Sequence, residues 1–515
     1  MSRRAAIDIA ILLAVWEILG RFKLVAHGAL PAPSEIAVRF IADFHDYPHH
    51  VAATLSTASI GFIIGNLVAL AAGIFFVMVP ASSLLARGIN ITLFAMPPIA
   101  VVPLLVVTLD GTTARILLAA LACYFPTMTA TVLGLTRIDA RAVDVVRAYG
   151  GTRLDILKLV QLRSALPAIL GGLRIAAPGA VLGAILAEFG GGGRWGLGAY
   201  LLGSLGRADP ARLWGIGLTA TAIAALAYAA FAFLALRATG EARSVTMPAS
   251  AMPNIGAPGV FDRGWPRAAM IALAALLPLA LWWWLVAGLP EMIAKTPAAI
   301  LAYLFTAETA PLARAKLGAA LWETIPVALV GMAAGIAFAF ILAVLSQSFA
   351  AVRRILLPIA LVTQTMPLVA LTPLLVLLFG RGTGVMIVIT VSVTFFPAFV
   401  TIAQGLALVP KSALDVARAY GGNWWSEIRL VGAIAALPYL FAAARLSAPR
   451  ALLGVMIAEW LATGTGLGNL LNQSRGYLDY GMIWSVAVVS VLVAIFFYIV
   501  VSLVEDITLK RMGMG

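Results

Sequence analysis

Long, uninterrupted apolar segments limit this chain to one class of fold. Of its 515 residues 62% are hydrophobic and 11% are charged, whereas a soluble globular domain carries about 25% charged residues. Twelve segments are long enough to cross a bilayer as helices of about 20 residues. Because these apolar runs are continuous rather than alternating, we predict an all-α polytopic membrane protein and exclude a β-barrel.

The twelve predicted spans fall into two sets of six. The first set is 7–26, 54–79, 88–109, 116–135, 167–189 and 212–236, and the second is 268–289, 321–345, 355–379, 385–408, 438–460 and 481–504. Residues 237–267 are rich in Pro, Gly and Ala, which predicts a flexible cytoplasmic linker. We therefore expect a first repeat at 1–236 (core about 51–236) and a second at 268–515 (core about 317–505).

One stretch of sequence occurs twice and shows that the two sets are related. Asp144 to Glu188 aligns without gaps on Asp415 to Glu459, with 20 identities in 45 positions. The separation of roughly 270 residues is far longer than a solenoid period, so the chain contains a duplicated domain. An even number of spans and a cytoplasmic linker give both repeats the same orientation, so we predict parallel repeats.

Charge predicts how the chain lies in the membrane. More Lys and Arg side chains fall in cytoplasmic segments when both termini are placed in the cytoplasm. The net charge of +13 then fits cytoplasmic loops and anionic lipids, and we expect no nucleic acid partner. The single cysteine, Cys123, excludes an internal disulfide and a cysteine metal cluster. We expect a multi-pass protein of a bacterial inner membrane.

The repeated stretch lies in two cytoplasmic loops, 138–165 and 409–436. Its apolar residues follow helical spacing, and Gly150-Gly151 should end the first short helix because glycine accepts left-handed geometry. Thr152 and Asp155 then form a capping-box pattern for a second helix, and Asn423 takes the capping place in the second copy. Two short helices joined in this way form a rigid knob. A rigid knob can transmit a displacement from a partner protein. The alternative interpretation is a purely structural helical hairpin that covers the membrane surface.

These loops resemble the "EAA" loops of permeases from binding-protein-dependent ABC importers, and in particular the nitrate, sulfonate and taurine permeases with their thiamine-precursor and riboflavin relatives. The pattern here is Asp144, Gly150 and Leu166-Pro167, and again Asp415, Gly421 and Leu437-Pro438. Further shared motifs are Leu30-Pro31-Ala32-Pro33, Met96-Pro97 with Pro103, Gly172-Leu173-Arg174, Ala187-Glu188, Gly196-Leu197-Gly198 and Gly466-Leu467-Gly468. The acidic position holds Asp here where the family pattern has Glu.

The resemblance implies a type-1 ABC importer permease fold with both permease halves fused in one chain. It also implies that each loop is a coupling helix, docked on an ATPase subunit and opening the membrane gate when the ATPase dimer closes. The residues carried over for coupling are Asp144, Arg147, Gly150 and Gly151, and Asp415, Arg418, Gly421 and Gly422. The implied partners are an ABC ATPase homodimer, which binds ATP and Mg, and a periplasmic or extracellular substrate-binding protein. The implied cargo is a small anion or a heterocyclic compound, moved inward.

Charged residues inside spans are candidates for the translocation path or its gate. Arg174 and Arg445, with Arg450 further in, either help an anionic solute to pass or pair with a carboxylate or with free carbonyl groups. Glu188 and Glu459 lie about 21 Å further along the same helices, too far to pair with these arginines, and are expected near the outer gate. His45, His49 and His50 are expected in an interfacial loop, and we predict no metal site.

Motifs of a phosphate-binding loop, a zinc protease or a serine hydrolase do not occur in the sequence, so we expect no cofactor in this chain and no enzymatic activity of its own. An ion-gradient-driven secondary transporter is the main alternative, since it also shows twelve spans in two parallel repeats. A membrane-embedded enzyme is the second alternative. The acidic residues lie mostly at span ends or in loops, which argues against a proton relay through the spans.

Overall fold

The computed structural model describes residues 3–25, 28–79, 92–207, 209–239, 265–349 and 368–513, with the single residues 82, 90 and 352. The helices of the first repeat are α1 (Arg3–Arg21), α2 (Pro33–Ala42), α3 (Tyr47–Met78), α5 (Pro98–Thr108), α6 (Gly111–Thr136), α7 (Ala140–Ala148), α8 (Arg153–Ile156), α9 (Leu162–Gly191), α10 (Leu197–Ser204) and α11 (Pro210–Thr239). A π-helical segment, Leu157–Gln161, joins α8 to α9, and a 3-10 turn, Leu205–Arg207, follows α10.

The helices of the second repeat follow the same order. They are α12 (Trp265–Val286), α13 (Pro297–Phe305), α14 (Ala310–Ser348), α16 (Leu368–Phe379), α17 (Thr383–Ala407), α18 (Lys411–Ala419), α19 (Trp424–Glu427), α20 (Ala433–Ala435), α21 (Leu437–Ala458), α22 (Gly466–Gly476) and α23 (Tyr480–Arg511). Two π-helical segments, Ile428–Gly432 and Glu459–Thr463, flank α20 and α21.

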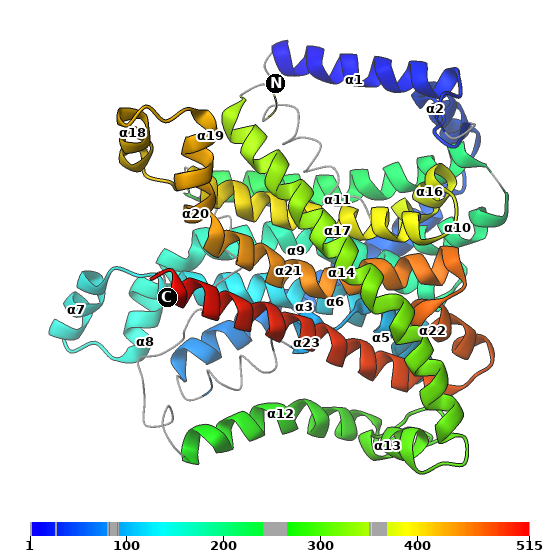
Figure 1. The fold of residues 1–515 in the computed structure, drawn as a ribbon. Coiled ribbons are helices and arrows are strands. Elements are labelled where there is room, and N and C mark those ends of the chain that lie inside the picture. Colours follow the sequence, from blue (N-terminus) through cyan, green and yellow to red (C-terminus); the bar gives the residue numbers. More distant parts are fainter. Residues whose placement is uncertain are drawn as a thin grey trace.

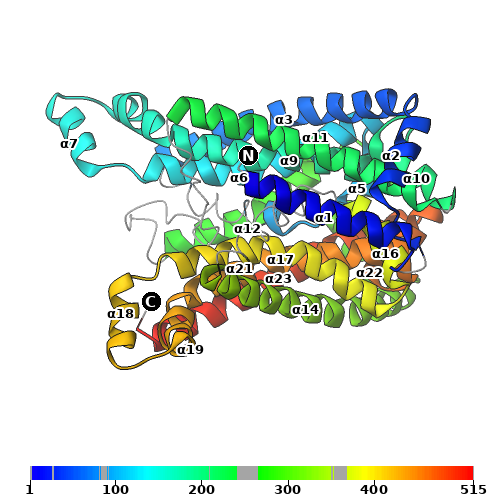
Figure 2. The same ribbon diagram turned by 90° about the horizontal axis from the view of Figure 1, so that it is seen from above.

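The two repeats lie side by side with their long helices roughly parallel (Figures 1 and 2). The pairs α7/α8 and α18/α19 protrude at one end of the molecule, which we call the hairpin end, while α10 and α22 lie at the opposite end. Within the described residues, eight helices are long and apolar enough to cross a membrane, four in each repeat. The predicted all-α polytopic fold with two repeats is thus confirmed.

Small residues let the central helices of each repeat pack closely. In the first repeat, a side chain at Gly61 or Gly65 of α3 would collide with Ala119 or Ala120 of α6. In the second, Gly331 and Gly335 of α14 lie in the same way against Thr390 and Thr394 of α17. Backbones that approach this closely gain van der Waals contact, which drives helix association where lipid removes the hydrophobic effect.

Each repeat contributes one short helix that packs against both repeats, and we call this the exchange of α5 and α16. The α5 helix packs against α9 of its own repeat and against α21, α22 and α23 of the other. In return, α16 packs against α17 and α21 and also against α9, α10 and α11. Both helices contain a proline, Pro103 and Pro373, at matching places in the duplicated sequence.

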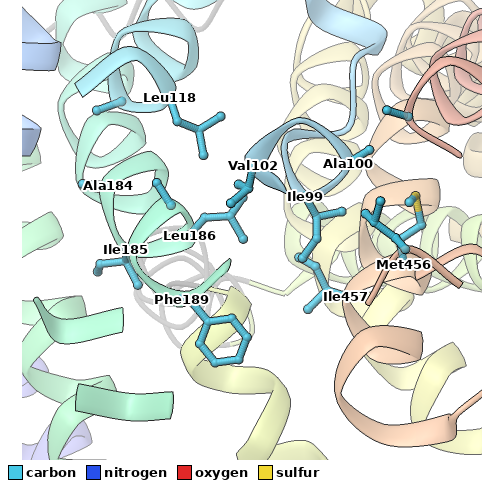
Figure 3. Packing of buried hydrophobic residues seen from close by; sticks show 14 of the residues in the cluster. Ile99, Ala100, Val102, Leu118, Ala184, Ile185, Leu186, Phe189, Met456 and Ile457 are labelled. Atoms are coloured by element: carbon cyan, nitrogen blue, oxygen red, sulfur yellow. The ribbon is translucent and has the colours of Figure 1, made fainter. Parts of the chain in front are cut away.

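An apolar cluster closes the space between the repeats around α5. We call Ile99, Val102, Leu186, Phe189, Met456 and Ile457 the apolar seal; all six are buried in one hydrophobic cluster. In Figure 3, Val102 points toward Leu186 of α9, and Ile99 points toward Ile457 of α21. The apolar seal therefore links α9 and α21, which correspond to the fifth predicted span of each repeat, through α5 of the first repeat.

Some predictions fall wholly or partly outside the described residues. Most of the linker 237–267 and the pair Met366-Pro367 lie there, as do parts of the predicted spans 88–109 and 355–379. The proposed repeat boundaries stay predictions. Residues Arg153–Gly191 form one continuous helical segment, so the second helix of the first loop continues directly into the span.

Candidate functional site

Each repeated loop forms a tight helical hairpin. We call residues 138–165 hairpin 1 and residues 409–436 hairpin 2. In hairpin 1, Asp139 caps α7 by accepting a hydrogen bond from Arg141 N. Thr152 Oγ1 accepts from Asp155 N, and Thr152 N donates to Asp155 Oδ2 (2.7 Å), which completes the predicted capping box at α8. Asn423 takes the capping place in hairpin 2 and accepts from Ser426 N (3.0 Å).

The Gly-Gly pairs make the turn in both hairpins. Gly150 and Gly421 adopt φ values of +76° and +78°, a conformation that costs an L-amino acid about 1–2 kcal/mol. Gly151 N donates to Val146 O and Gly422 N to Ala417 O, both at 2.9 Å, as in a Schellman cap. At Gly151, a side chain would also collide with Val146. The two glycines of each pair therefore have separate roles, one in the backbone angle and one in close approach.

The tip of each hairpin presents an aromatic ring to solvent. Tyr149 and Tyr420, the last residues before the turns, are each 90% exposed. The neighbouring Asp144–Arg147 and Asp415–Arg418 pairs are also exposed, with closest N–O distances of 3.8 and 3.5 Å. A flat amphipathic ring with few rotatable bonds is a preferred anchor at protein interfaces. The sequence pattern did not indicate Tyr149 or Tyr420 as a contact residue.

Hairpin 2 is held by an ion pair that hairpin 1 lacks. Arg418 of α18 donates to both carboxylate oxygens of Glu427 on α19, at 2.7 and 3.0 Å. This hydrogen bond holds the pKa of Glu427 below its ordinary value. The aligned residue in hairpin 1 is Ile156, so Arg147 has only Asp144 as an ion-pair partner among the described residues. In the sequence this difference is visible only as Ile156 in hairpin 1 at the position of Glu427 in hairpin 2.

Both hairpins are fixed to the helices of their own repeat. Gln161 Nε2 donates to Leu135 O of α6 (3.1 Å), and Trp424 Nε1 donates to Ser348 Oγ at the end of α14 (2.7 Å). Because α8 continues into α9, a displacement of hairpin 1 acts directly on a helix that carries part of the apolar seal. In hairpin 2 the path to the seal runs through α20 and the break before Leu437.

Two matching clusters of buried polar groups lie at the opposite end. In the first repeat, Thr54 Oγ1 donates to the Glu188 carboxylate at 2.9 Å and accepts from Leu197 N at 2.9 Å. Gly198 N also donates to Glu188 (2.9 Å). The second repeat has the same arrangement with Thr324, Glu459, Leu467 and Gly468, at 2.7, 2.9 and 2.8 Å. We call these arrangements the glutamate clusters.

The glutamate clusters attach the short end helices to the spans. Each carboxylate meets the N-terminus of α10 or α22, where helix N–H groups favour an anion. Glu188, Glu459 and both threonine side chains are fully buried. A side chain at Gly198 or Gly468 would collide with the carbonyl group of Ile185 or Met456, so glycine permits this close contact. The position of Glu188 and Glu459 near the outer gate stays a prediction. The sequence pattern did not indicate Thr54 and Thr324, which lie more than 130 residues away in the chain.

The intramembrane arginines Arg174 and Arg445 contact the last helix of their own repeat. The Arg174 guanidinium lies over the Tyr228 ring of α11, with Cζ 4.2 Å from the centroid. Arg445 forms an ion pair with Glu505 of α23, with Nε 3.0 Å from Oε2. The structure therefore does not bring these two arginines together with Glu188 or Glu459. It also separates all four from the hairpins.

Within the described residues, no three His, Cys, Asp or Glu side chains gather as metal ligands would. His50 lies in the first glutamate cluster region, with Nδ1 3.2 Å from Gly196 N and its ring stacked on Tyr200 at 4.4 Å. What the arrangement does offer is two rigid exposed tips at one end and a closed apolar centre between the repeats.

Comparison with known proteins identifies the repeats. The sequence profile described as "Binding-protein-dependent transport system inner membrane component" matches residues 39–240 and again residues 331–513. Each match includes one hairpin and one buried glutamate, Glu188 or Glu459. Solved structures give no significant match.

Individual relatives resemble about one repeat each. The riboflavin transport system permease protein RibX of Chloroflexus aurantiacus is 29% identical over 31% of this chain and 59% of its own length. A probable ABC transporter permease protein of Haemophilus influenzae is 29% identical over 42% of this chain and 87% of its own length. The taurine transport system permease protein TauC of Escherichia coli is 28% identical over 34% of this chain and 68% of its own length.

Proposed function

The chain belongs to the family of binding-protein-dependent transport system inner membrane components, and from this premise we propose that it is the complete permease of an ABC importer. A duplicated permease domain supplies both halves of a translocation unit in one polypeptide. Its solute would be small, of the kinds named for its relatives, which include riboflavin, formylaminopyrimidine, aliphatic sulfonates and taurine.

The observation that carries this proposal is the pair of matching hairpins at one end of the molecule (Figure 1). Each hairpin is a short capped helix, a glycine turn and a second helix joined to a span. Each presents an exposed tyrosine beside an exposed Asp–Arg pair. Two equivalent knobs match a partner with two equivalent grooves, which a homodimeric ATPase provides.

We assign the hairpins to the coupling of ATP hydrolysis to transport. The partner ATPase would bind ATP and Mg, and its closure would push on Tyr149 and Tyr420. The rigid α8–α9 segment would carry that displacement toward the apolar seal. A soluble substrate-binding protein would deliver solute at the opposite end, near α10 and α22. Under this proposal the chain lies in a bacterial inner membrane, with the hairpins and both termini in the cytoplasm.

A co-purification experiment tests the docking assignment. The full chain is purified in detergent with candidate ATPase subunits from the same cell, and the Tyr149→Ala/Tyr420→Ala variant is compared with wild type. Removal of two interface anchors should weaken ATPase binding by about tenfold or more. Tyr477→Ala is the matched control, because Tyr477 is 84% exposed but lies at the opposite end after α22. Equal ATPase recovery from all three proteins would contradict the assignment.

A further inference from the structure

A third arginine, Arg450, lies on α21 within a predicted span and differs from the other two. Arg174 and Arg445 are held by Tyr228 and Glu505. Among the described residues, no carboxylate forms an ion pair with Arg450, and Arg450 is half-buried rather than buried. A guanidinium at membrane depth is costly unless it meets a partner or a water-filled space. Arg450 therefore requires a polar environment that the described side chains do not supply.

The burial pattern of α21 shows which way Arg450 faces. From Ala448 to Ala458 every residue is buried except Arg450 and Leu453. These two residues share one helix face with Ile457, at spacings of three and seven residues. Ile457 belongs to the apolar seal and faces Ile99 of the other repeat (Figure 3). The accessible face of α21 is thus turned toward the space between the repeats.

The position along the helix places Arg450 on the hairpin side of the seal. Seven residues of α-helix separate Arg450 from Ile457, which is about 10 Å along the axis. The chain of α21 runs from hairpin 2 toward the glutamate cluster at Glu459. Arg450 is therefore a charged group just below a closed apolar constriction, on the side from which solute would leave.

The aligned position in the first repeat is less tightly packed than the next turn of the same helix. Gly179 aligns with Arg450, and a side chain at Gly179 would meet only the Ala122 carbonyl group, with O at 3.3 Å. One turn later, a side chain at Gly183 would press against Leu118 O and Ala119 at 2.8–3.2 Å. The aligned position therefore lies at the edge of the helix packing, and only one repeat places a charge there.

We propose that Arg450 binds an anionic group of the transported solute, such as a carboxylate, sulfonate or phosphate, on the hairpin side of the apolar seal. This inference rests on the proposed permease function and adds the chemical class of the solute. A planar guanidinium matches these oxyanions with two parallel hydrogen bonds. Because the aligned residue of the first repeat is Gly179, the solute contacts a charged side chain from the second repeat and none at the matching position of the first.

Cysteine labelling tests the location of Arg450 without requiring transport. In a Cys123→Ala background, which removes the only cysteine, Arg450→Cys is exposed in membrane vesicles to a sulfonate-bearing thiosulfonate reagent from the hairpin side. Modification should be about tenfold faster than at Ala448→Cys, a buried position on another face of α21. Equal slow rates at both positions would overturn the proposal.

Protection by an anion tests the binding step. Leu453→Cys retains Arg450 and is labelled with a neutral reagent, with and without millimolar ethanesulfonate. Ethanesulfonate should slow this labelling about threefold or more, and Arg450→Gln should remove the protection while Arg450→Lys keeps part of it. Arg237→Gln is the matched control, because the exposed Arg237 lies over the Phe233 ring at the end of α11, and it should leave the protection unchanged. Absence of protection with Arg450 present, or equal protection in Arg450→Gln, would overturn the proposal.

Transport separates this inference from the proposed function. The full chain is reconstituted with its ATPase and binding protein and given taurine, an alkanesulfonate and riboflavin. Sulfonate uptake that falls about tenfold in Arg450→Gln but not in Arg237→Gln supports the inference. Riboflavin uptake alone, unaffected by Arg450→Gln, overturns the inference and leaves the permease function standing. Failure of ATP-dependent uptake of every solute contradicts the proposed function, and the two labelling results then decide the inference.

Discussion

At the scale of single residues, each glutamate cluster depends on a threonine hydroxyl that both donates and accepts. Thr54 Oγ1 accepts a hydrogen bond from Leu197 N and donates one to the Glu188 carboxylate. The donors to Glu188 and Glu459 within the described residues are neutral groups, a hydroxyl and a backbone N–H. A fully buried carboxylate with few donors is sensitive to the loss of any one of them.

The Thr54→Val variant should lower the free energy of unfolding by about 2 kcal/mol, because it removes a hydrogen bond to a buried carboxylate and leaves Leu197 N without its acceptor. Thr324→Val should have the same effect in the second repeat. Thr57→Val is the matched control, since the Thr57 hydroxyl donates only to backbone carbonyl groups of α3. Unfolding of the detergent-solubilised protein measures all three. A control as destabilised as Thr54→Val would refute the role of the cluster.

Residues whose roles are local could be predicted from the sequence, and residues whose roles are tertiary could not. Gly150, Thr152 and Asn423 act within their own turns, so spacing and residue type were sufficient. Thr54 meets Glu188 across 134 positions, and Arg445 meets Glu505 on another helix. The spacing of residues along one helix does not show which other helix packs beside it. The partners of Thr54 and Arg445 could therefore be identified only from the structure.

At the scale of elements, the two hairpins share one backbone design but differ in rigidity. Hairpin 1 continues without a break into α9, while hairpin 2 is closed by the Arg418–Glu427 ion pair between its helices. The alignment shows this difference only as Ile156 against Glu427. We infer that hairpin 1 is stiffened by its continuity with the span and hairpin 2 by its internal ion pair.

Replacement of Glu427 by Ile, the residue of hairpin 1, should loosen hairpin 2. Amide hydrogen exchange in α18 should become about twofold to fivefold faster, as expected for loss of an exposed ion pair. Hairpin 1 in the same molecule is the internal control and should not change. Because the pKa of Glu427 is lowered, the ion pair is present at neutral pH and is lost as the pH falls through that lowered pKa. Unchanged exchange in α18 at neutral pH would contradict this account.

At the scale of the whole molecule, the exchanged helices α5 and α16 make the two repeats one unit. Each packs against spans of both repeats, and α5 supplies Ile99 and Val102 to the apolar seal. The hairpins lie at one end of the molecule, and α10 and α22, whose N-termini meet Glu188 and Glu459, lie at the other (Figure 2). We therefore expect movement of one repeat against the other to change the packing of the seal.

The sequence predicted the duplication and the helical membrane fold because both follow from long-range identity and continuous apolar runs. It did not predict the exchange of α5 and α16. Their proline-containing segments show where a helix is short, but not which repeat the helix contacts. The seal is likewise built from ordinary apolar residues such as Val102 and Ile457, which no pattern distinguishes from lipid-facing positions.

We propose that ATP hydrolysis in a partner subunit drives this permease through its two hairpins. The most direct measurement is solute uptake by proteoliposomes containing the chain, its ATPase and its binding protein, for wild type and for Gly150→Pro/Gly421→Pro. Proline cannot adopt the positive φ of these positions. We expect uptake that needs ATP, withstands a protonophore and is lost in the double variant. Uptake driven by a proton or sodium gradient without the ATPase would show instead that the chain is a secondary transporter.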